Sequence, residues 1–329
     1  MKITILGTGA YGLALATMAH LNNHEITMWS HNKNELDELN VKHTNNRVLP
    51  NFVMPNGITY TDNFEEAIKE SELIIFAVPA GAVDSVSKIL SNYYNNQHIC
   101  IASKGIEQDT CLFVCDVFSK YIQTDKIAVI SGPSFAIDIV KKVPIGLSLA
   151  TKNKETEEIV IKALRNEYLQ LRPTEDIVGI EICGSVKNII AIAAGIIDGM
   201  GLPESTQAMF ITEALHDIKE IIKGLNGNPK TILSFAGFGD LLLTATSIKS
   251  RNFRFGKMIG EGNPQELIDE YINNTTIEGL YTLRSIYKLL GDRNVSIPII
   301  NIIYDVIFNN TDKEEIVKYL IKKNQQPKL

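Results

Sequence analysis

The glycine-rich segment near the N-terminus constrains the fold of this chain more than any other feature. Residues 2–6 have the β-branched composition of a short buried strand, and residues 13–21 have that of an apolar helix. Between them, Gly7, Gly9 and Gly12 form the pattern G-x-G-x-x-G. In this setting the first glycine makes a tight turn, the second lets a pyrophosphate approach the backbone, and the third lets helix and strand pack closely. The segment therefore predicts a dinucleotide site at a helix N-terminus. The alternative is a glycine-rich turn that binds nothing.

Strand and helix patterns alternate through the next part of the chain. Helices are expected at 64–69 and 153–164, and buried strands at 25–29, 72–78, 98–103, 127–131, 145–150 and 168–171. This alternation predicts an α/β fold with a doubly wound parallel sheet of the Rossmann type, which binds ligands at the carboxyl ends of its strands. Lys104 and the turn Gly132–Ser134 follow two of these strand ends, so they are candidate site residues by position. A strand-end lysine can equally be a plain solvated residue.

The end of the second strand bears on which dinucleotide is bound. In NAD-selective folds an Asp or Glu about 20 residues beyond the glycine motif binds the ribose 2′-hydroxyl. Here the strand at 25–29 ends in Ser30, His31 and Asn32, without a carboxylate. We therefore expect NADP to be accepted as well as NAD, with His31 or Asn32 binding the 2′-phosphate. The alternative is an ordinary polar loop.

The second half of the chain has a different pattern. No convincing strand follows residue 176, and helices are expected at 181–198, 204–223, 238–260, 264–271, 277–290 and 312–323. We therefore predict two domains. Residues 1–178 form a dinucleotide-binding Rossmann domain, and residues 179–329 form an all-α domain that binds the substrate and carries the catalytic residues.

A single lysine interrupts the most apolar of these helices. No side chain from Ile189 to Ile197 is polar, and Lys187 and Asn188 precede this run. A lysine in apolar surroundings loses water, and desolvation lowers an ammonium pKa towards the range useful for proton transfer. The alternative is a first-turn lysine whose stem covers apolar surface while its head reaches solvent. The helix also has a face of small residues that lets a backbone or a ligand approach closely, formed by Gly184, Ala191, Ala194 and Gly195.

Two further stretches carry polar groups that could take part in catalysis or binding. Asp240 stands at a glycine-loosened helix start, with Thr244 one turn later on the same face. Asp240 can equally be a first-turn acid that stabilises the helix. The segment 249–257 interleaves cations with aromatic residues, and Arg251 within it suits a single phosphate-binding pocket.

Composition excludes several classes of protein. A net charge of −6 argues against an extended nucleic-acid surface. The four cysteines form neither a disulfide framework nor a metal site, which indicates free thiols in a reducing compartment, the cytoplasm, and no bound metal. No uninterrupted apolar run reaches the roughly 18 residues that a membrane span needs.

Taken together, these stretches closely resemble the bacterial NAD(P)-dependent glycerol-3-phosphate dehydrogenases. The matching segments occur in the order of that family, from Gly7 to Gly279: GTGAYGLALA, SKGIE, ISGPSFA, GSVKNIIAIAAGIIDG, GFGDLLLT, SRNFRFG and IEG. The resemblance implies reversible, NAD(P)H-dependent reduction of dihydroxyacetone phosphate to sn-glycerol 3-phosphate, which supplies phospholipid synthesis. It also implies a homodimer.

The resemblance further assigns roles to individual residues. Lys187 is the implied proton donor and acceptor. The other implied catalytic residues are Lys104, Asp240, Asn188 and Thr244. The implied cofactor contacts are Gly7, Gly9, Ala10, Tyr11, Gly12, His31, Lys104, Ala136, Arg251 and Glu278. The implied substrate contacts are Lys104, Gly132, Ser134, Lys187, Asp240, Ser250, Arg251 and Asn252.

General chemistry agrees with these roles. Hydride transfer to a ketone builds negative charge on its oxygen, so a cation must stabilise that charge and a proton must follow. Two other functions stay open at this point. One is a 3-hydroxyacid or ketopantoate reductase, which also combines a Rossmann and a helical domain but acts on a carboxylate. The other is a dinucleotide sensor without catalysis.

Overall fold

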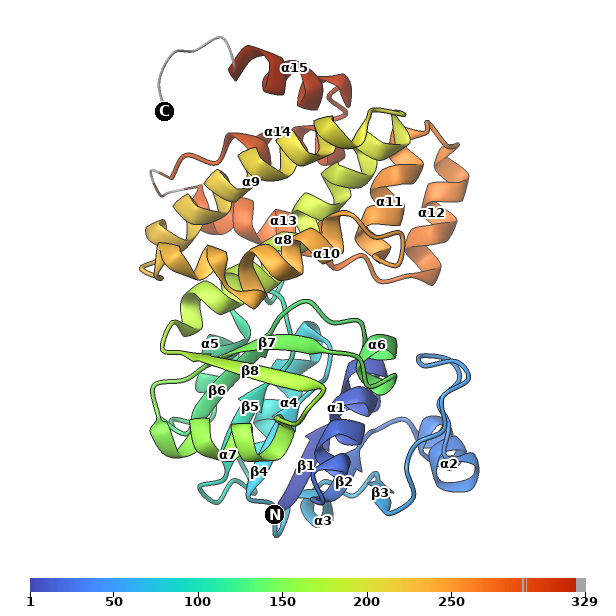
Figure 1. Ribbon diagram of the computed structural model, residues 1–329, viewed down its shortest axis with the longest axis vertical. Coiled ribbons are helices and arrows are strands. Elements are labelled where there is room, and N and C mark those ends of the chain that lie inside the picture. Colours follow the sequence, from blue (N-terminus) through green and yellow to red (C-terminus); the bar gives the residue numbers. More distant parts are fainter. Residues whose placement is uncertain (292, 294, 324–329) are drawn as a thin grey trace. The chain divides into compact units, whose positions relative to one another are not determined.

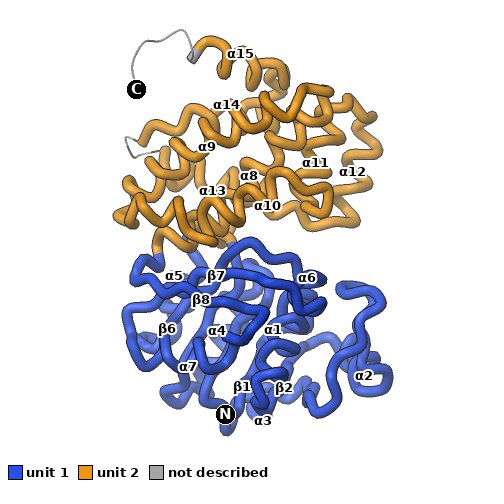
Figure 2. The backbone as a smooth tube through the Cα atoms, in the orientation of Figure 1, with its two compact units in different colours: residues 1–104, 112–177 blue, residues 105–111, 178–329 orange. Residues whose placement is uncertain are grey.

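The computed structural model describes residues 1–291, 293 and 295–323. The chain divides into two compact units, coloured separately in Figure 2. The first comprises Met1–Lys104 and Leu112–Ile177, and the second comprises Gly105–Cys111 and Val178–Leu329. Residues 324–329, the polar end of the predicted second domain, lie outside the described residues.

The first unit is built on an eight-stranded sheet with the order β3-β2-β1-β4-β5-β6-β7-β8 (Figure 1). Its first six strands are parallel. This confirms the predicted Rossmann-type sheet, and the strand order reverses at β1, where such sheets bind their ligands. The strands are β1 (Lys2–Leu6), β2 (Glu25–Trp29), β3 (Ile58–Thr61), β4 (Leu73–Phe76), β5 (His98–Ile101), β6 (Ile127–Ser131), β7 (Ile145–Ala150) and β8 (Leu169–Thr174).

Helices cover both faces of this sheet, which is why its central strands are mostly apolar. Ile3 and Ile5 of β1 belong to the same apolar core as residues of α1, α6 and α7. On the other face Thr4 donates to the carbonyl oxygen of Ala67 in α3, and Phe76 packs edge-on against Phe118 in α5. The helices are α1 (Ala10–Leu21), α2 (Lys33–Lys42), α3 (Phe64–Ile68), α4 (Val83–Leu90), α5 (Val114–Ser119), α6 (Ala136–Val140) and α7 (Lys154–Leu164).

The predicted doubly wound parallel sheet is confirmed, except that its last two strands run in the opposite direction to the other six. β7 pairs with β6 in the antiparallel direction, and β8 is parallel to β7. The connection between β6 and β7 contains only α6, a helix of five residues. Such a helix spans about 7.5 Å, less than half of the roughly 17 Å that a five-residue strand covers. The chain therefore turns back beside β6 instead of returning to the start of the sheet.

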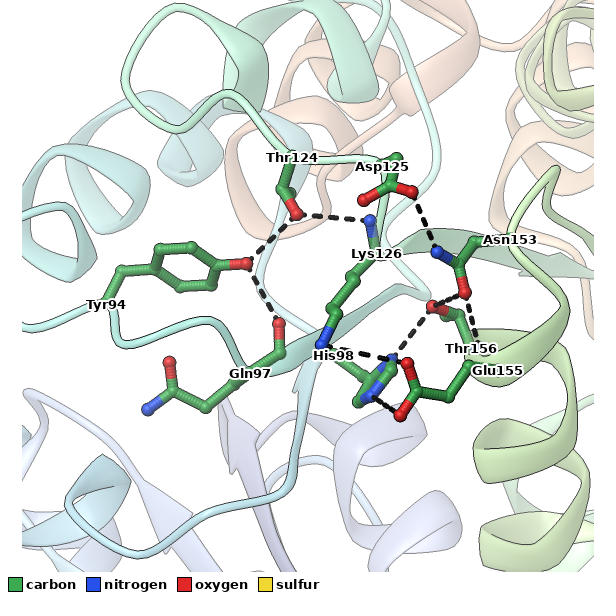
Figure 3. Close-up of polar contacts among 9 residues, drawn as sticks. All are labelled: Tyr94, Gln97, His98, Thr124, Asp125, Lys126, Asn153, Glu155 and Thr156. Atoms are coloured by element: carbon green, nitrogen blue, oxygen red, sulfur yellow. Dashed lines mark hydrogen bonds and ion pairs between the residues drawn. The ribbon is translucent and has the colours of Figure 1, made fainter.

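A network of polar side chains lies at the N-terminal ends of β5 and β6 (Figure 3). His98, the first residue of β5, is buried, and its Nδ1 lies 2.9 Å from Thr156 Oγ1 in α7. Its Nε2 lies 3.7 Å from Glu155 Oε1, and Glu155 also pairs with Lys126 at 3.8 Å. Asn153 caps α7 and donates to Asp125 at 2.9 Å, which ties the helix to the turn before β6.

We expect His98 to make the stability of the first unit depend on pH. Burial, and then the charge of Lys126, lowers the pKa of His98 below its ordinary value of 6.5. His98 therefore binds a proton near pH 6.5 in the unfolded chain, but only at a lower pH in the folded chain. The free energy of unfolding should be unaffected above that pH and should fall as the pH drops below it. Thermal melts of the wild type and of His98→Gln between pH 7.5 and pH 5 test this. The variant should lose less stability on acidification, and parallel curves for the two proteins would contradict the assignment.

The second unit is helical, as the sequence predicts, but its elements differ in detail. The expected helix at 238–260 is two helices, because the side chain of Ser250 accepts from the backbone N–H of Phe253 and begins a new one. Pro298 occupies the first position of a helix that the sequence analysis did not find, a position where proline is favoured. The helices are α8 (Ile177–Gly199), α9 (Glu204–Gly224), α10 (Asp240–Ala245), α11 (Arg251–Gly260), α12 (Gln265–Asn274), α13 (Glu278–Leu290), α14 (Pro298–Phe308) and α15 (Glu314–Lys323).

α8 is the core helix of this unit. It has 23 residues and, by length and composition, could cross a membrane, which the search for uninterrupted apolar runs did not detect. However, 94% of its apolar window is buried inside the protein, which identifies it as a core helix.

Gly195, one residue of the small-residue face predicted for α8, packs directly on α11. A Cβ atom on Gly195 would lie 2.0 Å from the carbonyl oxygen of Phe253, and one on Gly256 would lie 1.8 Å from that of Ile192. Neither distance is possible for a real side chain, so the two backbones can meet only because glycine lines both sides. This contact fixes the position of α11 against α8, and therefore the position of the cationic segment at the start of α11.

Candidate active site

The glycine loop of the first unit has the geometry that a dinucleotide phosphate requires. Gly7 has a φ of +113°, and a Cβ atom on Gly12 would lie 2.4 Å from the carbonyl oxygen of Gly7. By contrast, a Cβ atom on Gly9 would meet nothing within 4 Å, so this side of the loop is open. α1 begins at Ala10 with no side-chain cap and no acidic residue in its first turn. Its first N–H groups and its positive dipole end therefore suit a pyrophosphate.

Three predicted site residues meet at the carboxyl ends of the parallel strands. The Lys104 ammonium lies 5.7 Å from the centre of the Tyr11 ring, and the Tyr11 hydroxyl lies 3.3 Å from Ser134 Oγ. These residues follow β5, β1 and β6, so they lie at the same end of the parallel strands. Gly132, two residues before Ser134, is closely packed, because a Cβ atom there would lie 2.8 Å from the carbonyl oxygen of Gly146. Ala136 is the first residue of α6.

A carboxylate that the sequence analysis overlooked also reaches the glycine loop. His31 is exposed at the end of β2, and Asn32 caps α2 by accepting from the N–H of Glu35. The Glu35 carboxylate accepts from Thr8 Oγ1 at 2.5 Å. The sequence correctly shows no acid directly at the end of β2. However, Glu35 in the first turn of α2 places a carboxylate beside the glycine loop. Asn followed three residues later by Glu is a known signature of a helix start and could have revealed it.

Lys187 and Asp240 form a buried ion pair in the second unit. Lys187 Nζ lies 2.5 Å from Asp240 Oδ1, and only 11% and 2% of the two side chains are exposed. The alternative of a first-turn lysine reaching solvent is therefore wrong. α8 begins at Ile177, so Lys187 stands well inside the helix. Thr244, one turn beyond Asp240, donates to the Asp240 carbonyl oxygen at 2.6 Å and lies beside the carboxylate at 3.5 Å.

A kinked turn directly precedes Asp240. The turn covers Phe235–Gly239 and leads directly into α10, with non-helical backbone angles at Gly237. A Cβ atom on Gly237 would lie 2.3 Å from the carbonyl oxygen of Ile232, so only glycine fits there. Ser234 caps the turn by accepting from the Gly237 N–H. The glycine-loosened helix start expected from the sequence is thus a kink in the backbone directly before Asp240.

A second polar cluster begins at Asn188, the residue next to the lysine. Its Nδ2 donates to Glu278 Oε2 at 3.2 Å, and Glu278 Oε1 lies 3.7 Å from Arg251 Nη2. Asn252 Oδ1 accepts from the N–H of Gly279 at 2.9 Å. Gly279 packs so closely that its Cβ atom would lie 2.7 Å from the Asn188 carbonyl oxygen. The starts of α11 and α13 therefore meet on α8 at the position of Asn188.

The second unit thus joins a buried ammonium–carboxylate pair and a guanidinium cluster through two consecutive residues of one rigid helix. Arg251 is about half exposed, with 48% of its side chain accessible, so it can meet a ligand. An ammonium can stabilise negative charge on an oxygen and supply a proton, and a guanidinium suits phosphate oxygens.

Comparisons with known proteins decide the family. Residues 2–157 match the family described as NAD-dependent glycerol-3-phosphate dehydrogenase N-terminus, and residues 176–318 match the corresponding C-terminus. This chain belongs to the NAD-dependent glycerol-3-phosphate dehydrogenase family. The expected family, fold class and NAD(P)-dependent dehydrogenase class are therefore confirmed.

Individual relatives match over nearly the whole length. Glycerol-3-phosphate dehydrogenase [NAD(P)+] of Fusobacterium nucleatum is 35% identical over 331 residues, which cover 99% of this chain and 98% of the relative. The enzyme of the same name from Staphylococcus aureus is 34% identical, with 99% of each chain covered. The crystal structure of glycerol-3-phosphate dehydrogenase from Coxiella burnetii superimposes with a TM-score of 0.90 at 30% identity, covering 97% of this chain and 98% of that one.

Membership of the glycerol-3-phosphate dehydrogenase family narrows the functions left open by the sequence. A reductase of carboxylate substrates and a sensor without catalysis would each lie outside the class that both halves of the chain match. The roles of single residues, including the cofactor contacts implied for Arg251 and Glu278, stay predictions that need direct tests.

Proposed function

We propose that this chain catalyses the reversible reduction of dihydroxyacetone phosphate to sn-glycerol 3-phosphate with NADH or NADPH, and so supplies glycerol phosphate for phospholipid synthesis. The observation that carries this proposal is the buried pair of Lys187 and Asp240, which adjoins the Asn188–Glu278–Arg251 cluster along α8. A ketone that carries a phosphate needs both a proton donor beside its oxygen and a cation for its phosphate.

Lys187 is the proposed proton donor in reduction and the acceptor in oxidation. A nicotinamide cofactor, when bound at the glycine loop, would supply the hydride in reduction and accept it in oxidation. The Lys187 ammonium stabilises the negative charge that grows on the substrate oxygen and then gives up a proton to it. Asp240 holds the ammonium in place at 2.5 Å, and Thr244 lies beside the carboxylate. Burial strengthens these electrostatic effects, because little water screens the charges.

Arg251 is the proposed phosphate handle, together with Ser250 and Asn252. Asn252 is buried and held by the Gly279 N–H, and Ser250 begins the helix, so the backbone of this segment is fixed. Glu278 pairs with Arg251 and restrains its guanidinium. Phosphate binding by a fixed segment lets the binding energy of a small substrate align its carbonyl group for reaction. Lys104, Gly132 and Ser134 are proposed substrate contacts on the ground of the sequence resemblance.

Replacing the phosphate handle should raise the KM for dihydroxyacetone phosphate. We expect Arg251→Ala to raise it by more than about tenfold, the order expected for losing a charge-assisted hydrogen bond. Steady-state kinetics with saturating cofactor measure this. Arg254→Ala is the matched control, because it removes the same charge from the same helix at a residue that lies over the ring of Tyr271, 5.8 Å from its centre. A KM for Arg251→Ala within about twofold of the control value would show that the phosphate binds elsewhere.

The proposed reaction is tested by following NADH and NADPH oxidation with several ketones. Dihydroxyacetone phosphate should be reduced, whereas dihydroxyacetone and 2-dehydropantoate should react far more slowly, since the first lacks a phosphate and the second offers a carboxylate. Comparable turnover of 2-dehydropantoate would contradict the proposal.

The sequence resemblance also supports a homodimer in the cytoplasm. The four cysteines, Cys100, Cys111, Cys115 and Cys183, are buried thiols, which suits a reducing compartment. Light scattering coupled to gel filtration tests the oligomeric state, and a monomer at micromolar concentration would contradict it.

A further inference from the structure

Glu35 and Arg47 form an ion pair beside the glycine loop that none of the roles above uses. Glu35 stands in the first turn of α2, directly after β2. One carboxylate oxygen pairs with the Arg47 guanidinium, and the other accepts from Thr8 Oγ1 at 2.5 Å. Thr8 lies between Gly7 and Gly9. Arg47 is therefore tied, through a single carboxylate, to the loop whose geometry suits a pyrophosphate.

The two partners differ sharply in exposure. Only 12% of the Glu35 side chain is accessible, whereas 70% of the Arg47 side chain is. Asn45 holds the same segment from the other side, because its side-chain amide donates to the Thr8 carbonyl oxygen at 3.1 Å. The Arg47 guanidinium is thus exposed, while the residues that hold it, Glu35 and Thr8, are fixed by hydrogen bonds. A guanidinium carries five N–H donors in a planar fork, so Arg47 can keep Glu35 and still bind phosphate oxygens.

The position of this pair matches the place where dinucleotide folds choose their cofactor. There, an acid after the second strand binds the ribose 2′-hydroxyl of NAD, and a nearby arginine accommodates the 2′-phosphate of NADP. In this chain the acid is already engaged on both oxygens by Thr8 and Arg47. Asn32, one of the two residues suggested by sequence, uses its side-chain oxygen to cap α2. Arg47 is an exposed cation here, as is Lys33 at the start of α2; Lys33 pairs with Asp62 at 3.6 Å, whereas Arg47 is held beside the glycine loop by Glu35.

We propose that Arg47, held in place by Glu35, binds the 2′-phosphate of NADP(H) and sets the preference for NADP(H) over NAD(H). The inference rests on the proposed function only in requiring a nicotinamide dinucleotide cofactor. Glu35 acts through Arg47 as a positioning residue. Because the carboxylate meets the loop through Thr8, it also keeps the cation at a fixed place relative to the bound pyrophosphate.

Binding measurements without substrate test this inference. Dissociation constants for NADPH, NADH, adenosine 2′,5′-bisphosphate and 5′-AMP are measured by calorimetry on the wild type, Arg47→Ala and Lys42→Ala. Lys42 is an exposed cation at the far end of α2 and controls for the loss of one positive charge. We expect Arg47→Ala to weaken NADPH and the bisphosphate by at least about tenfold, the order of a charge-assisted contact. NADH and 5′-AMP should stay within about twofold, and Lys42→Ala should leave all four unchanged.

Two outcomes would overturn the inference. If Arg47→Ala weakened the binding of NADPH and NADH equally, Arg47 would only support the structure of the loop. If it changed neither dissociation constant, Arg47 would not belong to the cofactor site. Failure of the proposed function is distinguishable from both, since it would appear as absent turnover of dihydroxyacetone phosphate by the wild type, whereas these binding constants are measured without substrate.

Discussion

Lys187→Met should lower kcat for dihydroxyacetone phosphate reduction by about 10²–10⁴, because it removes both the proton donor and the charge that stabilises the developing alkoxide. Methionine keeps the length and apolar packing of the side chain on α8. The dissociation constant for NADPH, measured by calorimetry, should stay within about threefold of the wild-type value, because the glycine loop belongs to the first unit. If the variant keeps more than about a tenth of wild-type kcat, Lys187 is not the proton donor and Lys104 becomes the better candidate.

A second variant separates lost chemistry from lost stability. In Lys187→Met the buried Asp240 carboxylate loses its cationic partner, and breaking a buried pair costs about 3–5 kcal/mol. The double variant Lys187→Met/Asp240→Leu removes both charges and should melt at a higher temperature than the single variant, since apolar replacement of a buried pair is often neutral. It should remain inactive. Recovery of activity with stability would mean that the single variant failed through misfolding.

Gly256→Ala should strongly destabilise the second unit. Its Cβ atom would lie 1.8 Å from the Ile192 carbonyl oxygen, so α8 and α11 would have to separate. Alanine is favoured over glycine within a helix by about 1 kcal/mol, so the expected loss is a net loss against that gain. We expect destabilisation of at least about 3 kcal/mol, a fall in melting temperature of about 6 °C or more. The KM for dihydroxyacetone phosphate should also rise, because α11 carries Arg251.

Gly291→Ala is the matched control in the same unit. Gly291 has no positive φ, and its Cβ atom would meet the nearest carbonyl oxygen at 3.4 Å, an ordinary contact. Its melting temperature should stay within about 1 °C of the wild-type value, the range of substitutions without a packing defect. If Gly256→Ala behaved like this control, the close contact between α8 and α11 would not exist in solution.

Most strands of the first unit could be predicted because they are buried on both faces and read as continuous apolar runs. β3 was missed because it alternates, with Ile58 and Tyr60 buried and Thr59 exposed, and because it lies at the edge of the sheet. The predicted direction of β7 was wrong because the direction depends on the length of α6, the helix that connects β6 to β7. A run of apolar residues contains no information about direction.

The site residues could be named from motifs, but their contacts could not. The backbone before Asp240 is kinked at Gly237, and a glycine in the sequence indicates such conformational freedom without giving the backbone angles. The close packing of α8 was predictable from its small residues, whereas its partner, α11, was not. Arg47 was missed for a related reason, since it reaches the glycine loop only through Glu35 and Thr8.

The most direct test of the central claim follows the transferred atoms. Wild-type protein, dihydroxyacetone phosphate and NADPH labelled with deuterium at the reactive C4 position should give sn-glycerol 3-phosphate with one deuterium at C2, detected by NMR. Lys187→Met, with NADPH bound at its unchanged affinity, should give at most about a hundredth of that product in the same time. Glycerol 3-phosphate without deuterium at C2, or equal labelled product from both proteins, would contradict the account.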